Sequence, residues 1–116
     1  HLARALTIRT RALGPNHPDV AQCLAAQSEL ERLAGGDATT PAERALQIFE
    51  AHPSTLKEDI YEARLRLARA LAARKPPDTA RARTLAEAAR DGFAALAPAD
   101  FASRRADAEA FLASLR

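Results

Sequence analysis

The sequence predicts an all-α protein built from stacked helical hairpins. Alanine fills 30 of the 116 positions and leucine 15, whereas valine and isoleucine together fill only four. Alanine and leucine favour helices, and β-branched residues are the ones that pleated sheets select. A four-residue pattern also recurs forty positions apart. Its first copy is Arg4, Ala5, Leu6 and Ile8, and its second copy is Arg44, Ala45, Leu46 and Ile48. A period of roughly 34 to 47 residues is typical of helix-pair solenoids.

A looser third copy follows, in which Leu2, Leu13 and Pro15 return as Leu85, Leu96 and Pro98. A chain of 116 residues has room for one domain. We therefore expect a single α-α superhelix over residues 1–116. Its repeat parts are expected at about 1–13, 18–51 and 55–97, and a C-terminal capping helix at about 99–115.

The first helix is expected from Leu2 to Leu13, where apolar residues recur at spacings of three and four. Gly14 ends it. Because Leu2 already lies inside an apolar helical pattern, we expect the chain to be part of a longer protein. The face that carries Leu2, Leu6 and Leu13 is then expected to pack against a preceding helix or to self-associate.

The second helix is expected from Pro18, since proline suits the first turn of a helix, to about Ala34, where two glycines follow. The segment from Thr39 to Pro41 is expected to cap a third helix that runs from Pro41 to about Ala51, before Pro53.

The fourth helix is expected from Leu56 to about Arg74. Thr55 and Glu58 have the spacing of a capping box in front of it. Two apolar stripes run along this helix, so it should pack in two directions. The first stripe contains Leu56, Ile60, Ala63, Leu67, Ala70 and Leu71, and the second contains Tyr61, Leu65, Ala68 and Ala72.

A fifth helix is expected from about Thr79 to Leu96, after a proline-containing turn. The last helix should end near Leu115 and face inward with Phe101, Ala108, Phe111, Leu112 and Leu115. Its opposite side is polar, with Arg104, Arg105, Asp107 and Glu109. A polar outer side suits the terminal element of a repeat stack.

Composition excludes several function classes. The formal net charge is only +2, so bulk charge predicts no nucleic-acid partner. No apolar run approaches the roughly 18 to 20 residues that span a bilayer, so we expect no membrane insertion and a soluble, cytoplasmic segment. Cys23 is the single cysteine, and we interpret it as a small buried apolar side chain.

The sequence offers little for catalysis. His17 and His52 each precede a proline in an expected turn, where they serve helix entry rather than acid–base chemistry. We found no phosphate-binding loop, metal-ligand spacing or dinucleotide fingerprint. We therefore expect no enzyme activity, no metal and no cofactor.

The candidate binding residues lie between the two stripes of the fourth helix, and they are Glu58, Glu62, Arg66 and Arg69, with Tyr61 beside them. One interpretation is a solvated side with a Glu62–Arg66 pair at i,i+4. The other is a groove lining that binds a charged peptide. Gln27 and Glu31 fall within the apolar side of the second helix, where they either pair with a neighbour such as Arg64 or face the groove.

The stretch from Arg4 to Ala21, with Ala-Leu-x-Ile followed by Leu-Gly-x-x-His-Pro-x-Val-Ala, resembles the kinesin-light-chain type of tetratricopeptide repeat. The alanine- and arginine-rich ending is similar to the repeat tails that follow some bacterial serine/threonine kinase domains. The resemblance implies binding of extended peptides or helices on a concave surface. Ala25 and Ala26 stand where that family often has paired asparagines that hold a peptide backbone.

Together these observations predict a non-catalytic protein-interaction module, which could be the regulatory tail of a larger signalling protein. The alternative is a structural spacer or dimerisation segment of a multidomain protein.

Overall fold

The computed structural model describes residues 2–52, 54–96 and 98–115. Six helices account for most of them: α1 (Leu2–Leu13), α2 (Pro18–Ala34), α3 (Thr39–Ala51), α4 (Lys57–Ala73), α5 (Thr79–Ala95) and α6 (Pro98–Ser114). No strand occurs in these ranges, and the predicted all-α class is confirmed. None of the described helices is long and apolar enough to cross a membrane.

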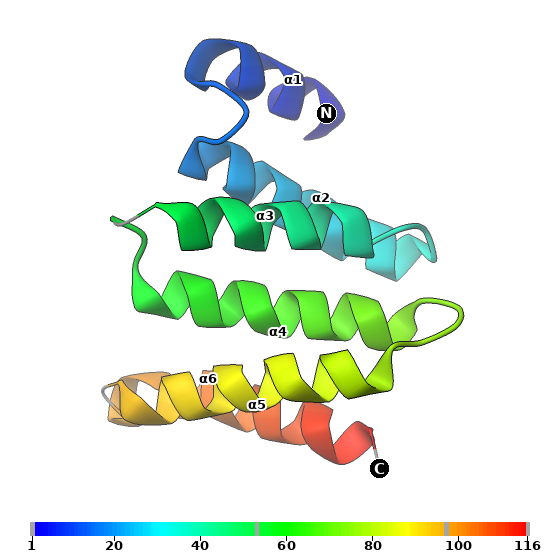
Figure 1. The fold of residues 1–116 in the computed structure, drawn as a ribbon, viewed down its shortest axis with the longest axis vertical. Helices are drawn as coiled ribbons and strands as arrows, with labels where there is room; N and C mark the ends of the chain where they lie inside the picture. Colours follow the sequence, from blue (N-terminus) through cyan, green and yellow to red (C-terminus); the bar gives the residue numbers. More distant parts are fainter. Residues whose placement is uncertain (1, 53, 97, 116) are drawn as a thin grey trace.

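The helices form a stack of antiparallel hairpins (Figure 1). Each helix packs against the next one in the chain, and α2 also contacts α4. The α2–α3 and α4–α5 turns lie on one side of the stack, at the right in Figure 1, and the other turns lie on the opposite side. In the same view α3 lies in front of α2, and α5 lies in front of α6. Stacked hairpins of this kind are the architecture that the repeated sequence pattern predicts.

The core is centred on α4 and α5. Leu65, Leu67, Leu71 and Phe93 are almost inaccessible to solvent, at 1% exposure or less. Alanines fill most of the remaining buried positions of these two helices, which are Ala63, Ala68, Ala70, Ala82, Ala86 and Ala89. Small side chains let the helix axes approach closely, so the core is thin and closely packed. The prediction that the fourth helix packs in two directions holds, because α4 contacts α2 and α3 as well as α5.

The start of α2 matches its sequence signals. His17 is the N-cap, and its Nδ1 accepts a hydrogen bond from the backbone N–H of Asp19 at 3.0 Å. Pro18 occupies the first helical turn. At the other end, Gly35 has a φ of 79°, a left-handed conformation that glycine adopts without steric cost. His17 therefore serves helix entry, as its position in the sequence predicts.

Two predicted caps are wrong. At α3 the capping carboxylate comes from Asp37, whose Oδ1 accepts from the backbone N–H groups of Thr39 and Thr40 at 3.0 and 3.2 Å. At α4 the helix begins at Lys57 with Leu56 as N-cap, and no side chain caps it. Thr55 therefore lies one residue too early, and its buried hydroxyl has no hydrogen-bond partner among the described residues. Leu56, which was expected in the first stripe, is 59% exposed.

The turn between α1 and α2 is held by α3. Arg44 donates hydrogen bonds to the carbonyl oxygen of Pro15 at 3.3 Å and to the side chain of Asn16. The Nε2 atom of His52 lies 2.6 Å from the carbonyl oxygen of Asn16. These contacts fix the position of the first hairpin on the second. His52 therefore has a structural role, as His17 has at the start of α2. Pro53, expected to break the chain after α3, lies outside the described residues.

The two terminal helices differ. In α6, Ala108 is fully buried, and Phe101, Phe111, Leu112 and Leu115 pack against the core. The polar side of α6 is exposed, as expected of a capping helix. In α1, Leu6 packs against the core, whereas Leu13 is 44% exposed and the side chain of Leu2 lies outside the described part. The α1 side expected to face a preceding helix is thus partly used against α2. Cys23 is buried, as predicted.

Candidate interaction surface

Three polar residues of α4 lie together on a side of the helix that does not face the core. Glu62, Arg66 and Arg69 are spaced by four and three residues, which places them on one side of a helix. All three are half-buried, while Ala63, Leu67 and Ala70 on the neighbouring side are fully buried. The sequence prediction of a polar strip along the fourth helix therefore agrees with the geometry.

Ion pairs connect this side of α4 to α2 and α6. Arg66 Nε lies 3.7 Å from Glu29 Oε1, and Glu29 is also bound by Arg32 at 3.0 Å. Glu62 pairs with Arg104 of α6 at 3.7 Å. We refer to Glu29, Arg32, Glu62, Arg66, Arg69 and Arg104 together as the charged face. The predicted Glu62–Arg66 pair is wrong, because each of these side chains binds a different helix instead.

The ion pairs of the charged face contribute little to the stability of the fold. Its ion-paired side chains on α2, α4 and α6 are 23% to 46% exposed, and exposed pairs contribute only ~0 to 1 kcal/mol to stability. The separation between Arg66 and Glu29 is too long for a hydrogen bond, and Arg66 Nε has no other partner within the described residues. These groups are therefore free to exchange partners at little cost to the fold.

Arg69 is the unpaired cation of the charged face. No hydrogen bond or ion pair connects it to any other part of the chain that the structure describes. On the opposite layer, by contrast, Arg81 of α5 binds Glu43 of α3 at 2.6 Å, and this hydrogen bond raises the pKa of the Arg81 guanidinium. A half-buried guanidinium without a partner can bind a carboxylate from another molecule.

Tyr61 does not lie beside the arginines of the charged face. Its ring meets the ring of Phe93 edge-on, with centroids 5.7 Å apart and planes at 83°. A Cβ atom on Gly92 would lie 2.6 Å from the Tyr61 ring, so the ring packs directly on the α5 backbone. Arg64 covers the ring from α4, at 5.8 Å from its centroid. Tyr61 is thus part of the α4–α5 contact.

The other three candidates form no ion pair or hydrogen bond with Arg66 or Arg69 in the part of the chain that the structure describes. Glu58 is half-buried in the first turn of α4, where a carboxylate stabilises the helix N-terminus. Gln27 and Glu31 are half-buried one turn apart on α2, and the Glu31 carboxylate lies against Gly36. Arg64, the partner considered for them, is 3.5 Å from Glu50 instead. The helix spacing therefore places Glu58 on the same side of α4 as Glu62, Arg66 and Arg69, whereas Gln27 and Glu31 belong to α2.

Sequence reasoning missed Glu29, Arg32 and Arg104. The i,i+3 spacing of Glu29 and Arg32 signals a local pair, but nothing local relates either residue to Arg66. Arg104 was expected only on an exposed polar side. In the described ranges no group of three or more histidine, cysteine, aspartate or glutamate side chains could hold a metal ion.

Comparisons with models of protein families, with curated proteins and with solved structures gave no match.

Proposed function

We propose that this protein is a non-catalytic protein-interaction module that binds a short peptide or protein segment along its charged face. In this proposal the chain is a cytoplasmic, tetratricopeptide-type repeat that serves as a regulatory tail of a larger signalling protein. The resemblance of residues 4–21 to kinesin-light-chain repeats supports this assignment, and that family binds peptides on the surface of its inner helices.

The observation that carries the proposal is the unpaired Arg69 within a face that three helices share. The face has surplus positive charge, because its four arginines accompany only Glu29 and Glu62. Charges at an interface chiefly determine which partner binds and how fast. A surface of this kind suits a segment that carries acidic side chains.

Arg69→Glu tests the proposal. A displayed library of random peptides would be selected against the wild-type protein, and the affinity of the selected peptides would be measured by fluorescence polarisation. We expect Arg69→Glu to weaken their binding roughly tenfold or more, because attraction becomes repulsion. The melting temperature should stay nearly constant, since Arg69 has no ion pair in the described residues and a partly exposed charge contributes only ~0 to 1 kcal/mol.

Arg4→Glu is the matched control, because it makes the same charge change at an exposed position of α1. It should leave peptide affinity unchanged. Leu67→Ala, in contrast to Arg69→Glu, should destabilise the fold, by about 2 to 5 kcal/mol, since Leu67 is fully buried. If Arg69→Glu unfolds the domain, or leaves the affinity of the selected peptides intact, the charged face is structural and the proposal fails.

A dimerisation or spacer segment is the second candidate. The observation that favours it is exposed apolar surface on the first two helices, where Ile8 is 58% and Leu33 74% exposed. Apolar side chains at such exposure can be covered by a second copy of the chain. Sedimentation velocity over a range of protein concentrations distinguishes this function, because a monomer at all concentrations excludes it.

A further inference from the structure

A hollow of about 420 Å³ lies between the α2–α3 turn and the C-terminal end of α4. The α2–α3 turn joins the first hairpin to the second, and α4 completes the second hairpin. Figure 1 shows that the turn and the C-terminal end of α4 lie on the same side of the stack. Arg32, Arg74 and Lys75 line the hollow together with the backbone of Gly35 and Gly36. Three cations from two hairpins thus meet at one site.

Among the described residues, Asp37 is the one acidic side chain that lines this hollow, and its oxygens already accept hydrogen bonds. Oδ1 accepts from the backbone N–H groups of Thr39 and Thr40, and Oδ2 accepts from the Thr40 hydroxyl at 2.6 Å. The Thr40 hydroxyl is the main reason that the pKa of Asp37 is lowered. The carboxylate therefore stabilises the start of α3 and is not free to neutralise the cations.

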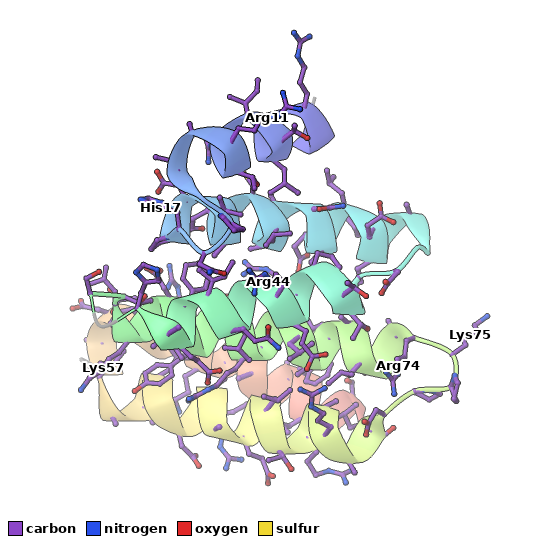
Figure 2. All side chains as sticks on the ribbon, turned by 45° about the horizontal axis from the view of Figure 1, so that its top comes forward. Arg11, His17, Arg44, Lys57, Arg74 and Lys75 are labelled. Atoms are coloured by element: carbon purple, nitrogen blue, oxygen red, sulfur yellow. The ribbon has the colours of Figure 1, made fainter. Side chains whose placement is uncertain are left out.

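The three cations differ in how far they are already paired. Arg32 binds Glu29 at 3.0 Å, and Arg74 lies 3.8 Å from Asp78. Lys75 has no ion pair with any residue in the described ranges. In Figure 2 its side chain extends outward from the α4–α5 turn. One unpaired cation beside two half-exposed guanidiniums matches a ligand group with a single negative charge.

The walls of the hollow leave room for a ligand. Ala70 and Ala73 contribute only methyl groups, and the space above Gly35 is open, with no atom within 4 Å of an added Cβ. Just before the turn, Leu33 is 74% exposed, and one turn earlier Leu30 is 57% exposed. An apolar surface therefore lies next to the cationic hollow.

We infer that this hollow binds an acidic side chain of a partner peptide, while Leu33 contacts an apolar residue beside it. The inference rests on the proposed function and locates one contact of the partner more closely. Arg32 links the two regions, because it lines the hollow and also binds Glu29 of the charged face. Leu33 supplies the apolar contact here, because the ring of Tyr61, the aromatic candidate on the fourth helix, packs against Phe93.

The experiment is an NMR titration of the ¹⁵N-labelled chain with N-acetyl-Asp-Leu-amide. We expect saturable shifts of the amide signals of Gly35, Gly36 and Lys75. N-acetyl-Asn-Leu-amide, which lacks the charge, should shift them roughly tenfold less at the same concentration, because a charge-assisted hydrogen bond is lost. Inorganic phosphate at matched ionic strength forms a third arm.

The chain offers a matched pair of variants, because its two lysines, Lys57 and Lys75, lie at opposite ends of α4 (Figure 2). Lys75→Glu should weaken binding of the acidic dipeptide roughly tenfold, and Lys57→Glu should leave it unchanged. The inference is overturned if the neutral dipeptide binds as tightly as the acidic one, or if Lys75→Glu and Lys57→Glu have the same effect on affinity. It is also overturned if phosphate shifts these amide signals but the acidic dipeptide does not, or if no probe shifts them.

The two proposals can fail separately. Selected peptides that require Arg69 but tolerate Lys75→Glu would support the proposed function and overturn the hollow as an acidic subsite. The opposite result is saturable binding of the acidic dipeptide at the hollow, with library peptides whose affinity Arg69→Glu does not change. It would establish the subsite and refute the charged face as the binding surface.

Discussion

Helices α4 and α5 enclose Leu65, Leu67, Leu71 and Phe93 at 1% exposure or less, whereas α1 and α2 leave four large apolar side chains 44% to 74% exposed. Aromatic contacts reinforce the first region. Phe93 meets Tyr61 edge-on and stacks on Phe101 of α6, with centroids 6.1 Å apart. The second region has alanines, Val20 and Cys23 as its buried apolar side chains.

The difference separates stability from recognition. Burial of large apolar side chains is the main favourable term in folding, so the α4–α6 part should dominate the free energy of unfolding. The α1–α2 part presents Leu30, Leu33, Arg32 and Glu29 to solvent or at half burial, next to the hollow. Residues that can be changed without unfolding the domain should therefore be found mainly at the surface of α2 and along the charged face.

Phe93→Ala should produce the largest effect. Phe93 is fully buried and contacts two other rings, so its truncation leaves a cavity in the main core. We expect a loss of about 3 to 5 kcal/mol in the free energy of unfolding, measured by urea denaturation. Because a small domain is only marginally stable, this loss could unfold a large share of the molecules.

Ile8→Ala is the control for that experiment. Ile8 is 58% exposed on α1, so its truncation should change the free energy of unfolding by no more than about 0.5 kcal/mol. Equal losses from Ile8→Ala and Phe93→Ala would show that the two regions contribute alike, and the comparison would then be wrong.

The order and extent of the helices could be predicted from sequence, because their signals are local. Pro18 at the first turn of α2 and Gly35 after its last residue act through backbone geometry alone. The caps were harder to predict. Thr55 can accept from the first turn of α4 only if it is the N-cap, and a shift of one residue in the helix start puts Leu56 there.

The charged face was predictable only within one helix. The spacing of Glu62, Arg66 and Arg69 follows from helix periodicity, but their partners do not. Glu29 and Arg104 reach them only because of the relative positions of α2, α4 and α6 in the stack. The place of Tyr61 likewise depends on α5, where Gly92 leaves room for its ring. Such contacts between distant segments leave no periodic signal in the sequence.

Asp37→Ala should have an intermediate effect, and it tests the start of α3, the helix that lies between the two regions in the chain. Its carboxylate accepts three hydrogen bonds from Thr39 and Thr40 at the start of α3. We expect a loss of about 0.5 to 2 kcal/mol, the range for removal of an N-capping side chain. Asp107→Ala, at an exposed position of α6, is the control and should cost less than about 0.5 kcal/mol.

The effect of Asp37→Ala should depend on pH. The pKa of Asp37 is lowered in the folded protein, mainly by the hydrogen bond from the Thr40 hydroxyl. The folded state therefore binds fewer protons than the unfolded state, and stability rises with pH through this range. The contribution of Asp37 is fully present above its unfolded pKa of about 3.9 and is lost as the pH falls through the folded pKa. A wild-type advantage that persists at the lowest pH would contradict this assignment.

The smallest effect concerns α1, whose opening should leave the rest of the stack intact. This helix is 12 residues long and packs mainly on α2, whereas α4 is 17 residues long and packs on α2, α3 and α5. Regions with few buried apolar contacts open at a lower free energy than the core. Amide hydrogen exchange in residues 5–13 should therefore be faster than in residues 63–71, because α1 can open while the rest of the stack stays folded.

Self-association through exposed Ile8 and Leu13 would slow the exchange of residues 5–13 only at high protein concentration. A protein that sediments as a monomer and still protects α1 as strongly as α4 would show that the first hairpin is as firmly packed as the core.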